Sequence, residues 1–219
     1  MRLFALATVV AVLQLSGCAA MNYKAAMPDV SVNCVDTLAG MPGTPLRFPV
    51  EGEEPDELEG FVEFAQLAHC YRPADSAAMP VALYKLESIT PPAEVKVSVQ
   101  LSTGGTFAAA LDVLDADMRP LRRYGFDAFV RRGSIYALDV FLNPSDRAPA
   151  YLLLMPDVAH VGGKDVTVGS QNSVAPIFAG PVMFAYRSST EVETENPLLQ
   201  GGKVRVVARP HRTAITFDK

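Results

Sequence analysis

Apolar and polar residues alternate strictly in part of this chain, and this alternation is the feature that most limits its possible folds. In residues 94–101 (EVKVSVQL), valine or leucine occupies every second position. Because successive side chains of a strand point to opposite faces, a period of two indicates a strand with one buried face. Further strand-like segments follow at 107–114, 134–142, 151–155, 166–168, 182–187, 203–209 and 214–217. The series predicts an all-β chain.

A succession of short strands separated by turn residues is typical of an antiparallel β-sandwich, and we expect one that is jelly-roll-like. Residues 102–105 (STGG) have the composition of a turn, so the strands at 94–101 and 107–114 are expected to pair as a hairpin. The segments at 134–142 and 151–155 are apolar on both faces and are predicted to be central strands. Seventeen prolines and fifteen glycines agree with many turns.

The N-terminal residues have the organisation of a bacterial export signal. Arg2 precedes an apolar stretch, residues 3–13, which is shorter than the roughly 20 residues that a spanning helix needs. The following Leu15-Ser16-Gly17-Cys18 is similar to the lipobox of bacterial lipoproteins, in which the cysteine thiol receives diacylglycerol. We therefore predict a signal peptide at 1–17 and lipidation of Cys18.

Lipidation would anchor the mature chain, because two or more acyl chains hold a protein firmly on a membrane. Ala19, not aspartate, follows Cys18, and by analogy with enteric sorting this favours the periplasmic face of the outer membrane. Residues 18–45 are rich in small residues, proline and glycine, and are interpreted as a lipidated tether. The sandwich domain with an N-terminal extension is assigned to 46–219, with its core at about 81–219.

Two conformations fit the segment that precedes this core. Residues 58, 61, 65 and 68 would lie on one side of a helix, whereas 61–64 (FVEF) also fits a strand. Periodicity does not decide between them over so short a run. The acidic residues at 51–59 are interpreted as a solvated face rather than a cation site.

Cysteine usage agrees with an oxidising compartment. Of the three cysteines, lipidation of Cys18 leaves Cys34 and Cys70, which we expect to form a disulfide that links the N-terminal region to the sandwich. Closing the loop between them would stabilise the fold by about 4 kcal/mol on the chain-entropy estimate. The sequence contains no CxxC motif and no Cys/His spacing typical of metal ligands, so neither redox nor metal chemistry is predicted for these cysteines.

The sequence offers little support for catalysis or metal binding. The histidines, at positions 69, 160 and 211, lie far apart and lack the spacing of a metal site or a catalytic triad. Asp112, Asp115 and Asp117 suggest calcium, but the glycine and terminal glutamate of an EF-hand loop are absent. We predict no catalytic residue, no metal and no cofactor. The net charge of −5 argues against nucleic acid as a partner.

The segment 121–129 (LRRYGFDAF) is predicted to be an exposed loop and is the best candidate for ligand contact. Aromatic rings pack on the apolar faces of sugars, while arginine and aspartate make directional hydrogen bonds to hydroxyls. The candidate residues are Arg122, Arg123, Tyr124, Phe126, Asp127 and Phe129. In the alternative interpretation, the aromatic residues cap the core of the sandwich and the arginines are solvated.

A resemblance to a known family lies in residues 80–154. It is carried by 80–84 (PVALY), the alternating strand at 95–101, 111–120 (LDVLDADMRP) and 151–154 (YLLL). These residues form an apolar strand, a proline-containing turn, an aromatic segment and a further strand. In this order of elements the chain resembles the maltose operon periplasmic protein family. The resemblance implies a non-catalytic periplasmic protein associated with maltodextrin uptake, and it carries over no site residues.

We therefore expect a non-catalytic lipoprotein, bound to the membrane through its lipid, with an accessory or binding role in maltodextrin uptake and a glucan as its ligand. The alternative is a structural or docking lipoprotein of an envelope complex, such as secretion or pilus machinery, with an envelope protein as its partner. A hydrolase is disfavoured because no nucleophile–base pair or carboxylate pair is identifiable.

Replacing the lipobox cysteine tests the predicted anchor. Cys18→Ser should release the protein from the membrane fraction or leave it unprocessed, because the thiol that carries the lipid is lost. Metabolic labelling with a fatty acid measures this directly. Equal labelling of the wild type and the variant would contradict lipidation at Cys18.

Overall fold

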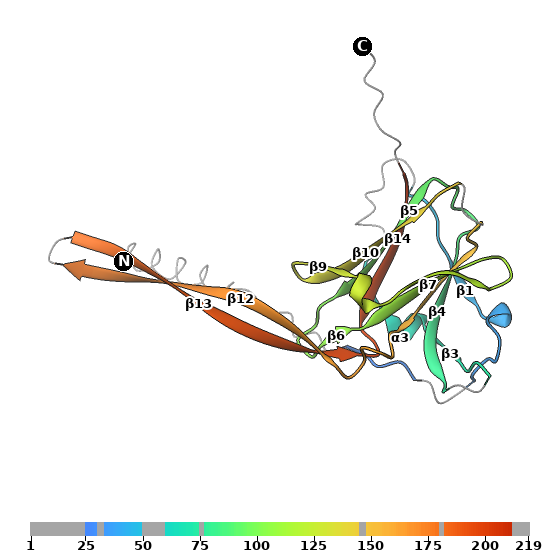
Figure 1. Cartoon of the computed structure of the whole chain (residues 1–219), viewed down its shortest axis with the longest axis horizontal. Helices are drawn as coiled ribbons and strands as arrows, with labels where there is room; N and C mark the ends of the chain where they lie inside the picture. Colours follow the sequence, from blue (N-terminus) through green and yellow to red (C-terminus); the bar gives the residue numbers. More distant parts are fainter. Residues whose placement is uncertain are drawn as a thin grey trace, which may run out of the picture.

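The computed structural model describes residues 25–29, 33–49, 60–74, 77–144, 148–179 and 182–211. Over these residues the protein is a sandwich of two β-sheets from which one long hairpin extends (Figure 1). The predicted all-β fold class is therefore confirmed. The predicted signal peptide, the lipobox and the strand at 214–217 lie outside the described residues. No helix within the described residues is long and apolar enough to cross a membrane.

The first sheet contains the strands that the sequence marks as most apolar. Its strands are, in spatial order, β1 (Gly43–Pro45), β4 (Met79–Lys85), β11 (Tyr151–Pro156), β7 (Ala109–Leu114) and β8 (Pro120–Tyr124), and β3 (His69–Tyr71) also pairs with β4. The segment YLLL begins β11, which lies in the middle of the sheet as predicted. Leu152 and Leu154 are buried toward the second sheet, whereas Leu153 and Met155 belong to a separate cluster on the outer face.

The second sheet is built around the alternating strand. Its order is β2 (Val62–Glu63), β14 (Lys203–Pro210), β5 (Ala93–Gln100), β10 (Ile135–Leu142) and β9 (Val130–Arg132). Val95, Val97 and Val99 of β5 have no exposed surface, as the period of two predicts. The segment for which the sequence allowed either a helix or a strand contains both, since α3 (Phe64–Leu67) follows β2 directly. Phe64 stacks on Phe107, with ring centroids 4.6 Å apart.

The predicted hairpin of residues 94–101 with 107–114 is wrong. The turn at Ser102–Gly105 forms, but β6 (Thr106–Phe107) then pairs with the base of another strand, and β7 enters the opposite sheet from β5. The burial patterns explain the difference. All residues of β7 are buried, and a strand that is apolar on both faces is stabilised where both faces of its sheet are covered.

The N-terminal segment joins the first sheet at Val35, which is earlier than the predicted domain start at residue 46. Cys34 and Cys70 form the predicted disulfide. The Val35 amide donates to the carbonyl of Cys70, and β1 pairs with β4 in parallel. Between these two attachments, η1 (Leu38–Gly40) and Met41 cover part of the apolar outer face of the first sheet.

The hairpin that leaves the sandwich is formed by β12 (Lys164–Ala179) and β13 (Val182–Leu199), of 16 and 18 residues. The sequence analysis predicted only two short strands here. At about 3.3 Å per residue, 16 residues reach roughly 50 Å. Among the residues that the structure describes, the hairpin pairs with the rest of the chain only at its base, through Leu198 and Leu199 of β13 and the two residues of β6.

Loss of the disulfide should destabilise the protein. We expect Cys34→Ala to lower the free energy of unfolding by about 2–5 kcal/mol, because the unfolded chain gains the entropy that the bridge removes. Denaturant unfolding measures the loss, and Cys70→Ala should give the same result because it removes the same bond. A change below about 1 kcal/mol in both variants would contradict a structural role for the bridge.

Candidate functional site

The segment predicted to be an exposed ligand-contact loop has a different conformation. Arg122, Arg123 and Tyr124 belong to strand β8, and η2 (Phe126–Ala128) is a short 3-10 helix. Phe126 and Phe129 are 7% and 5% exposed, and both belong to the main core cluster, against which Tyr124 also packs. The alternative interpretation therefore holds for Phe126 and Phe129: these two rings close the core at the side of the sandwich and are not available to stack on a sugar.

The polar residues of the same segment have separate surroundings. Both terminal nitrogens of Arg122 donate to the carbonyl oxygen of Phe141 at 3.1 Å, which ties β8 to the second sheet. Asp127 is exposed. Arg123 is also exposed, and its Nε lies 3.7 Å from Oδ1 of the buried Asp112. Among the six predicted contact residues, Arg123 lines a groove.

A carboxylate that the sequence analysis did not consider holds this segment in place. Oδ2 of Asp157 accepts a hydrogen bond from the amide of Phe126 at 2.8 Å and lies 2.9 Å from Nδ1 of His160. Burial acts to raise the pKa of Asp157, but the hydrogen bonds from Phe126, His160 and Ala159 outweigh it and lower the pKa below its usual value. His160 is therefore a partner of Asp157 at the edge of the core.

The groove beside Arg123 lies on the outer face of the first sheet and has a volume of about 270 Å³. Its lining residues are Leu38, Tyr71, Met79, Asp112, Leu114, Met118, Pro120, Arg123, Leu153, Met155, Pro156 and Val158. Burial raises the pKa of Asp112, although the nearby guanidinium of Arg123 opposes this effect. We refer to this site as the outer groove.

The aspartates considered for calcium do not converge around the groove. Oδ1 of Asp115 accepts hydrogen bonds from the amides of Asp117 and Arg119, both at 2.9 Å, so this side chain stabilises the turn between β7 and β8. Asp112 instead faces Arg123 from within β7. Among the described residues, no group of three or more His, Cys, Asp or Glu side chains could hold a metal ion.

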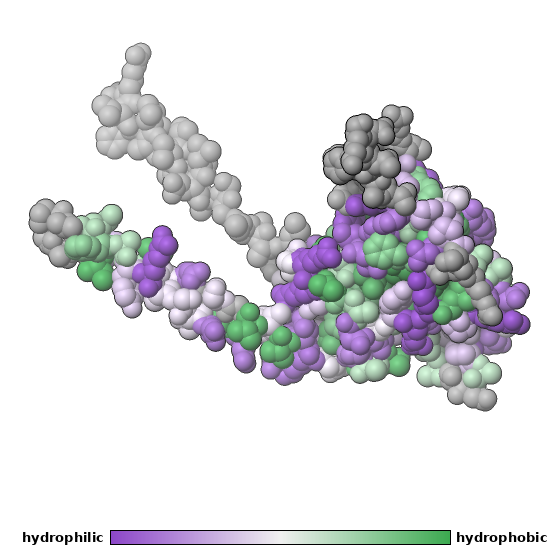
Figure 2. Space-filling model, turned by 45° about the horizontal axis from the view of Figure 1, so that its top comes forward, coloured by the Kyte–Doolittle hydropathy of each residue, from purple (hydrophilic) through white to green (hydrophobic). Residues whose placement is uncertain are grey.

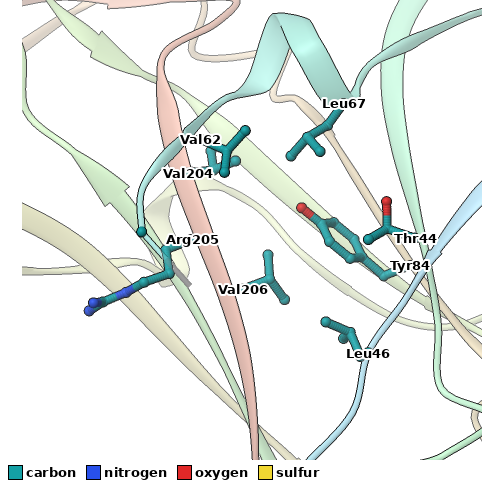
Figure 3. A pocket seen from close by; sticks show the side chains of 9 residues that line it. Thr44, Leu46, Val62, Leu67, Tyr84, Val204, Arg205 and Val206 are labelled. Atoms are coloured by element: carbon teal, nitrogen blue, oxygen red, sulfur yellow. The ribbon is translucent and has the colours of Figure 1, made fainter. Parts of the chain in front are cut away.

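A second cavity, of about 250 Å³, opens where the two sheets diverge between β1 and β14. Figure 3 shows aliphatic side chains such as Leu46, Leu67 and Val206 facing it, with Arg205 pointing away. The guanidinium of Arg205 instead lies over the ring of Phe61, 4.9 Å from its centroid. This cavity resembles an incompletely filled edge of the core more than a site for polar recognition.

The most unusual surface is the hairpin. Most of the large apolar residues that are exposed in the described chain lie on it: Val166, Val168, Val174, Ile177, Met183, Phe184, Tyr186 and Val192. Figure 2 shows apolar residues gathered near its distal end. Ile177 lies opposite Phe184 and Ala175 opposite Tyr186, so these four residues share one face. We refer to Val174–Ile177 with Met183–Tyr186 as the hairpin tip.

Charge is almost absent from the distal hairpin. No Asp, Glu, Lys or Arg occurs from residue 166 to 186, and Arg187 is the single charged residue from 166 to 190. Within the described residues, β12 pairs only with β13, and β13 pairs elsewhere only with β6 at its base. The ribbon therefore presents two strand edges and an uncharged apolar end, which are features of a surface that another molecule covers.

A polar cluster fixes the base of the hairpin to the sandwich. The hydroxyl of Tyr136 in β10 donates to Asp165 of β12, whose Oδ2 is also 3.7 Å from Nη1 of Arg131. The amide of Leu198 donates to the carbonyl of Gly163 at 2.9 Å, and the Leu198 side chain is buried. Burial, together with the hydrogen bond to Asp165, raises the pKa of Tyr136 to about 12.

In comparisons with protein-family models, curated proteins and solved structures, the chain matches none of them. The resemblance to the maltose operon family therefore rests on the residues quoted for it and stays an expectation.

The Tyr136–Asp165 contact predicts a loss of stability at high pH. The pKa of Tyr136 is about 12 in the folded protein, compared with its usual value of 10.0. The contribution of this hydroxyl to the free energy of unfolding is therefore fully present below about pH 10. It should be lost as the pH rises from about 10 to about 12. Tyr136→Phe should remove this pH dependence and cost about 1 kcal/mol of unfolding free energy at neutral pH.

Denaturant unfolding from pH 7 to pH 11 measures both effects as the difference between the variant and the wild type. Tyr186→Phe is the matched control, since its ring is 58% exposed on the hairpin tip. If Tyr136→Phe and the wild type lose stability in parallel above pH 10, the proposed contribution of this hydroxyl is incorrect.

Proposed function

We propose that this protein is a non-catalytic docking module of the bacterial cell envelope, held on a membrane by lipid on Cys18, with the hairpin tip as its contact for a partner protein. The observation that carries the proposal is the uncharged apolar tip, presented on a long hairpin whose base is fixed by Asp165. This is the docking alternative from the sequence analysis, and the hairpin favours it over a sugar-binding role.

The exposed tip would be unfavourable if it had no partner. Isolated two-stranded ribbons are marginally stable in water, and exposed strand edges favour association with other chains. Phe184 and Met183 are 57% and 63% exposed, although each is large enough to contribute about 1.5–3 kcal/mol if buried. A partner that adds a strand to an edge of the hairpin would gain main-chain hydrogen bonds and could provide pockets for alternate side chains.

The course of the N-terminal segment supports anchoring close to the hairpin. A side chain at Gly201, which follows β13, would lie 2.8 Å from the carbonyl oxygen of Ala26, so residue 26 packs beside the base of the hairpin. Cys18 precedes Ala26 by only a few residues, so that even a fully extended chain spans at most about 28 Å between them. A lipid on Cys18 would therefore keep the hairpin near the membrane surface.

Maltodextrin binding is a second candidate function, and a specific observation favours it. The outer groove places the guanidinium of Arg123 and the carboxylate of Asp112 beside Tyr71, which are groups that hydrogen-bond to hydroxyls. Binding at millimolar maltodextrin that is weakened by Arg123→Ala would support this role. The absence of binding at that concentration would leave docking as the better account.

Photo-crosslinking in living cells tests the docking function. A photoreactive amino acid in place of Phe184 should give protein adducts, whereas the same substitution at Phe141, which is 46% exposed on β10 of the sandwich, should not. Phe184→Ser should leave the melting temperature within about 2 °C of the wild type, because little of the ring is buried. No adduct from Phe184 in folded protein, or equal adducts from both positions, would contradict docking through the tip.

A further inference from the structure

A charged residue interrupts a fully buried strand of the first sheet. β7 has the sequence AALDVL, and all of its residues are buried, so Asp112 is a carboxylate among apolar side chains. Asp112 is 8% exposed and lines the outer groove, with Leu153 and Arg123 as its neighbours on the adjacent strands. Aspartate is depleted in strands, and a buried charge is costly unless it is paired. A residue that breaks such rules without local compensation is expected at a functional site.

The Asp112 carboxylate lacks the hydrogen bonds that its burial demands. Its Oδ1 atom is buried and has no hydrogen-bond partner among the described residues. Nε of Arg123 lies 3.7 Å from this oxygen, which is too far for a hydrogen bond, and the arginine side chain is 59% exposed. Leaving a buried acceptor unpaired costs free energy, and the cost is larger for a charged group. Because an exposed side chain changes rotamer readily, the pair offers an acceptor and a donor side by side to a bound molecule.

Apolar side chains extend the groove along the strands on both sides of Asp112. At one end lies Met155, which pairs with Ala110 of β7. At the other end lie Leu114 and Met118, the latter in the turn that follows β7. The four residues from Ala110 to Leu114 span about 13 Å, so the groove matches roughly four residues of an extended chain.

The lining of the groove suits flexible apolar side chains better than a sugar. Met79, Met118 and Met155 have unbranched side chains that adapt to irregular apolar partners. Met118 has a φ of 61°, in the left-handed region that favours glycine, and its side chain nevertheless lines the groove. Among the described residues that line the groove, Tyr71 is the single aromatic one, so a sugar would find little ring surface to stack on.

The charged groups at the groove balance each other. Asp112 faces Arg123, and in the neighbouring turn Asp117 lies 3.9 Å from Arg119. The groove therefore favours an uncharged occupant over a cation or an anion. Each residue of an extended peptide presents its N–H and C=O on the same side. These two groups match the acceptor of Asp112 and the donors of Arg123.

We infer that the outer groove binds an extended, uncharged and apolar peptide segment of another protein, with one backbone N–H donating to Asp112 and the C=O of the same residue accepting from Arg123. Side chains of this segment fill the apolar ends of the groove, at Met118 and at Met155. This contact is separate from the hairpin tip and goes beyond the proposed docking function.

Peptide binding to the full-length protein in lipid nanodiscs tests the inference. The probe is a dye-labelled pentapeptide of alternating leucine and serine with blocked ends, and we expect saturable binding below about 1 mM. The same peptide with its central amide replaced by an ester lacks the N–H donor. It should bind more weakly by on the order of tenfold, because a hydrogen bond to a charged group is lost. No saturable binding of the amide peptide would overturn the inference.

Substitutions at Asp112 separate recognition from a structural role. Asp112→Leu should weaken binding of the amide peptide on the order of tenfold and bind the amide and ester peptides equally. It should also raise the melting temperature by about 2–4 °C, because a buried and unpaired carboxylate is removed. Asp112→Asn retains one acceptor oxygen and should show a smaller loss of binding.

The matched control is the same exchange at an exposed aspartate outside the groove. Asp127→Leu should change neither peptide binding nor the melting temperature. A lower melting temperature in Asp112→Leu would show that the carboxylate stabilises the fold and would overturn the inference.

The remaining outcomes distinguish the groove from the hairpin tip and from a sugar site. Phe184→Ser leaves the groove intact and should not alter peptide binding. Loss of binding in this variant would place the peptide on the tip, which overturns the inference but keeps the docking function. Binding of maltoheptaose that Arg123→Ala weakens, without binding of the peptide, would overturn the inference in favour of the sugar. Peptide binding in the groove without any photoadduct from Phe184 would keep the inference and contradict docking through the tip.

Discussion

The arrangement of the sandwich depends on a first sheet that is apolar on both of its faces. Leu152 and Leu154 face the second sheet, so Leu153 and Met155, which alternate with them along β11, face outward. If this outer face stayed in water, the fold would lose about 1.5–3 kcal/mol of hydrophobic stabilisation for each large side chain that could be buried. Residues 33–45 cover it in part, and the Cys34–Cys70 disulfide fixes their position across β3 and β4. The outer groove is the portion of this face that they leave uncovered.

The hairpin differs from the first sheet, because it is polar in its middle and apolar at its end. Its direction is set at the base, where Asp165 joins Tyr136 of β10 and approaches Arg131 of β9. The low exposure of Tyr136, 6%, strengthens this contact because water competes little for the hydroxyl. A two-stranded ribbon with weak support along its length is thus oriented by a few contacts at one end, and the apolar tip is displayed away from the core.

Local patterns predicted the individual strands better than their partners. The alternation of Val95, Val97 and Val99 located β5 closely. The pair of cysteines that remains if Cys18 is assigned to the predicted lipid predicted the disulfide. The hairpin of β5 with the following strand was wrong, because turn residues indicate that the chain reverses but not which sheet it then joins. That choice depends on Phe107 and Leu111 packing between the sheets, which is a property of the whole core.

The candidate sites were harder to predict for a related reason. Residues 166–173 contain two valines among polar residues and a glycine, and the apolar residues 174–186 are interrupted by two prolines and a glycine. Their periodicity is therefore weak, and only short strands were expected. The absence of charge throughout this stretch is the signal that could have revealed an unusual surface. Phe126 and Phe129 were candidates for ligand contact, with closure of the core as the alternative, because aromatic composition alone does not distinguish a ring that closes a core from one that faces solvent. The Asp112–Arg123 pair depends on the register of β7 with β8, which the sequence does not specify.

The proposed lipid anchor would act on the hairpin contact through the energetics of association. If Ile177, Met183 and Phe184 were fully buried, they would contribute roughly 5–9 kcal/mol. Association costs an estimated 4–15 kcal/mol in lost translational and rotational freedom, so the tip alone supports only weak binding between molecules free in solution. Confinement to a membrane through Cys18 would remove much of this cost beforehand, because it raises the effective concentration of the chain near a partner at the same membrane and limits their relative orientations. A small apolar contact that is insufficient in solution could then hold the anchored chain against its partner, while remaining too weak for association before the chain reaches the membrane.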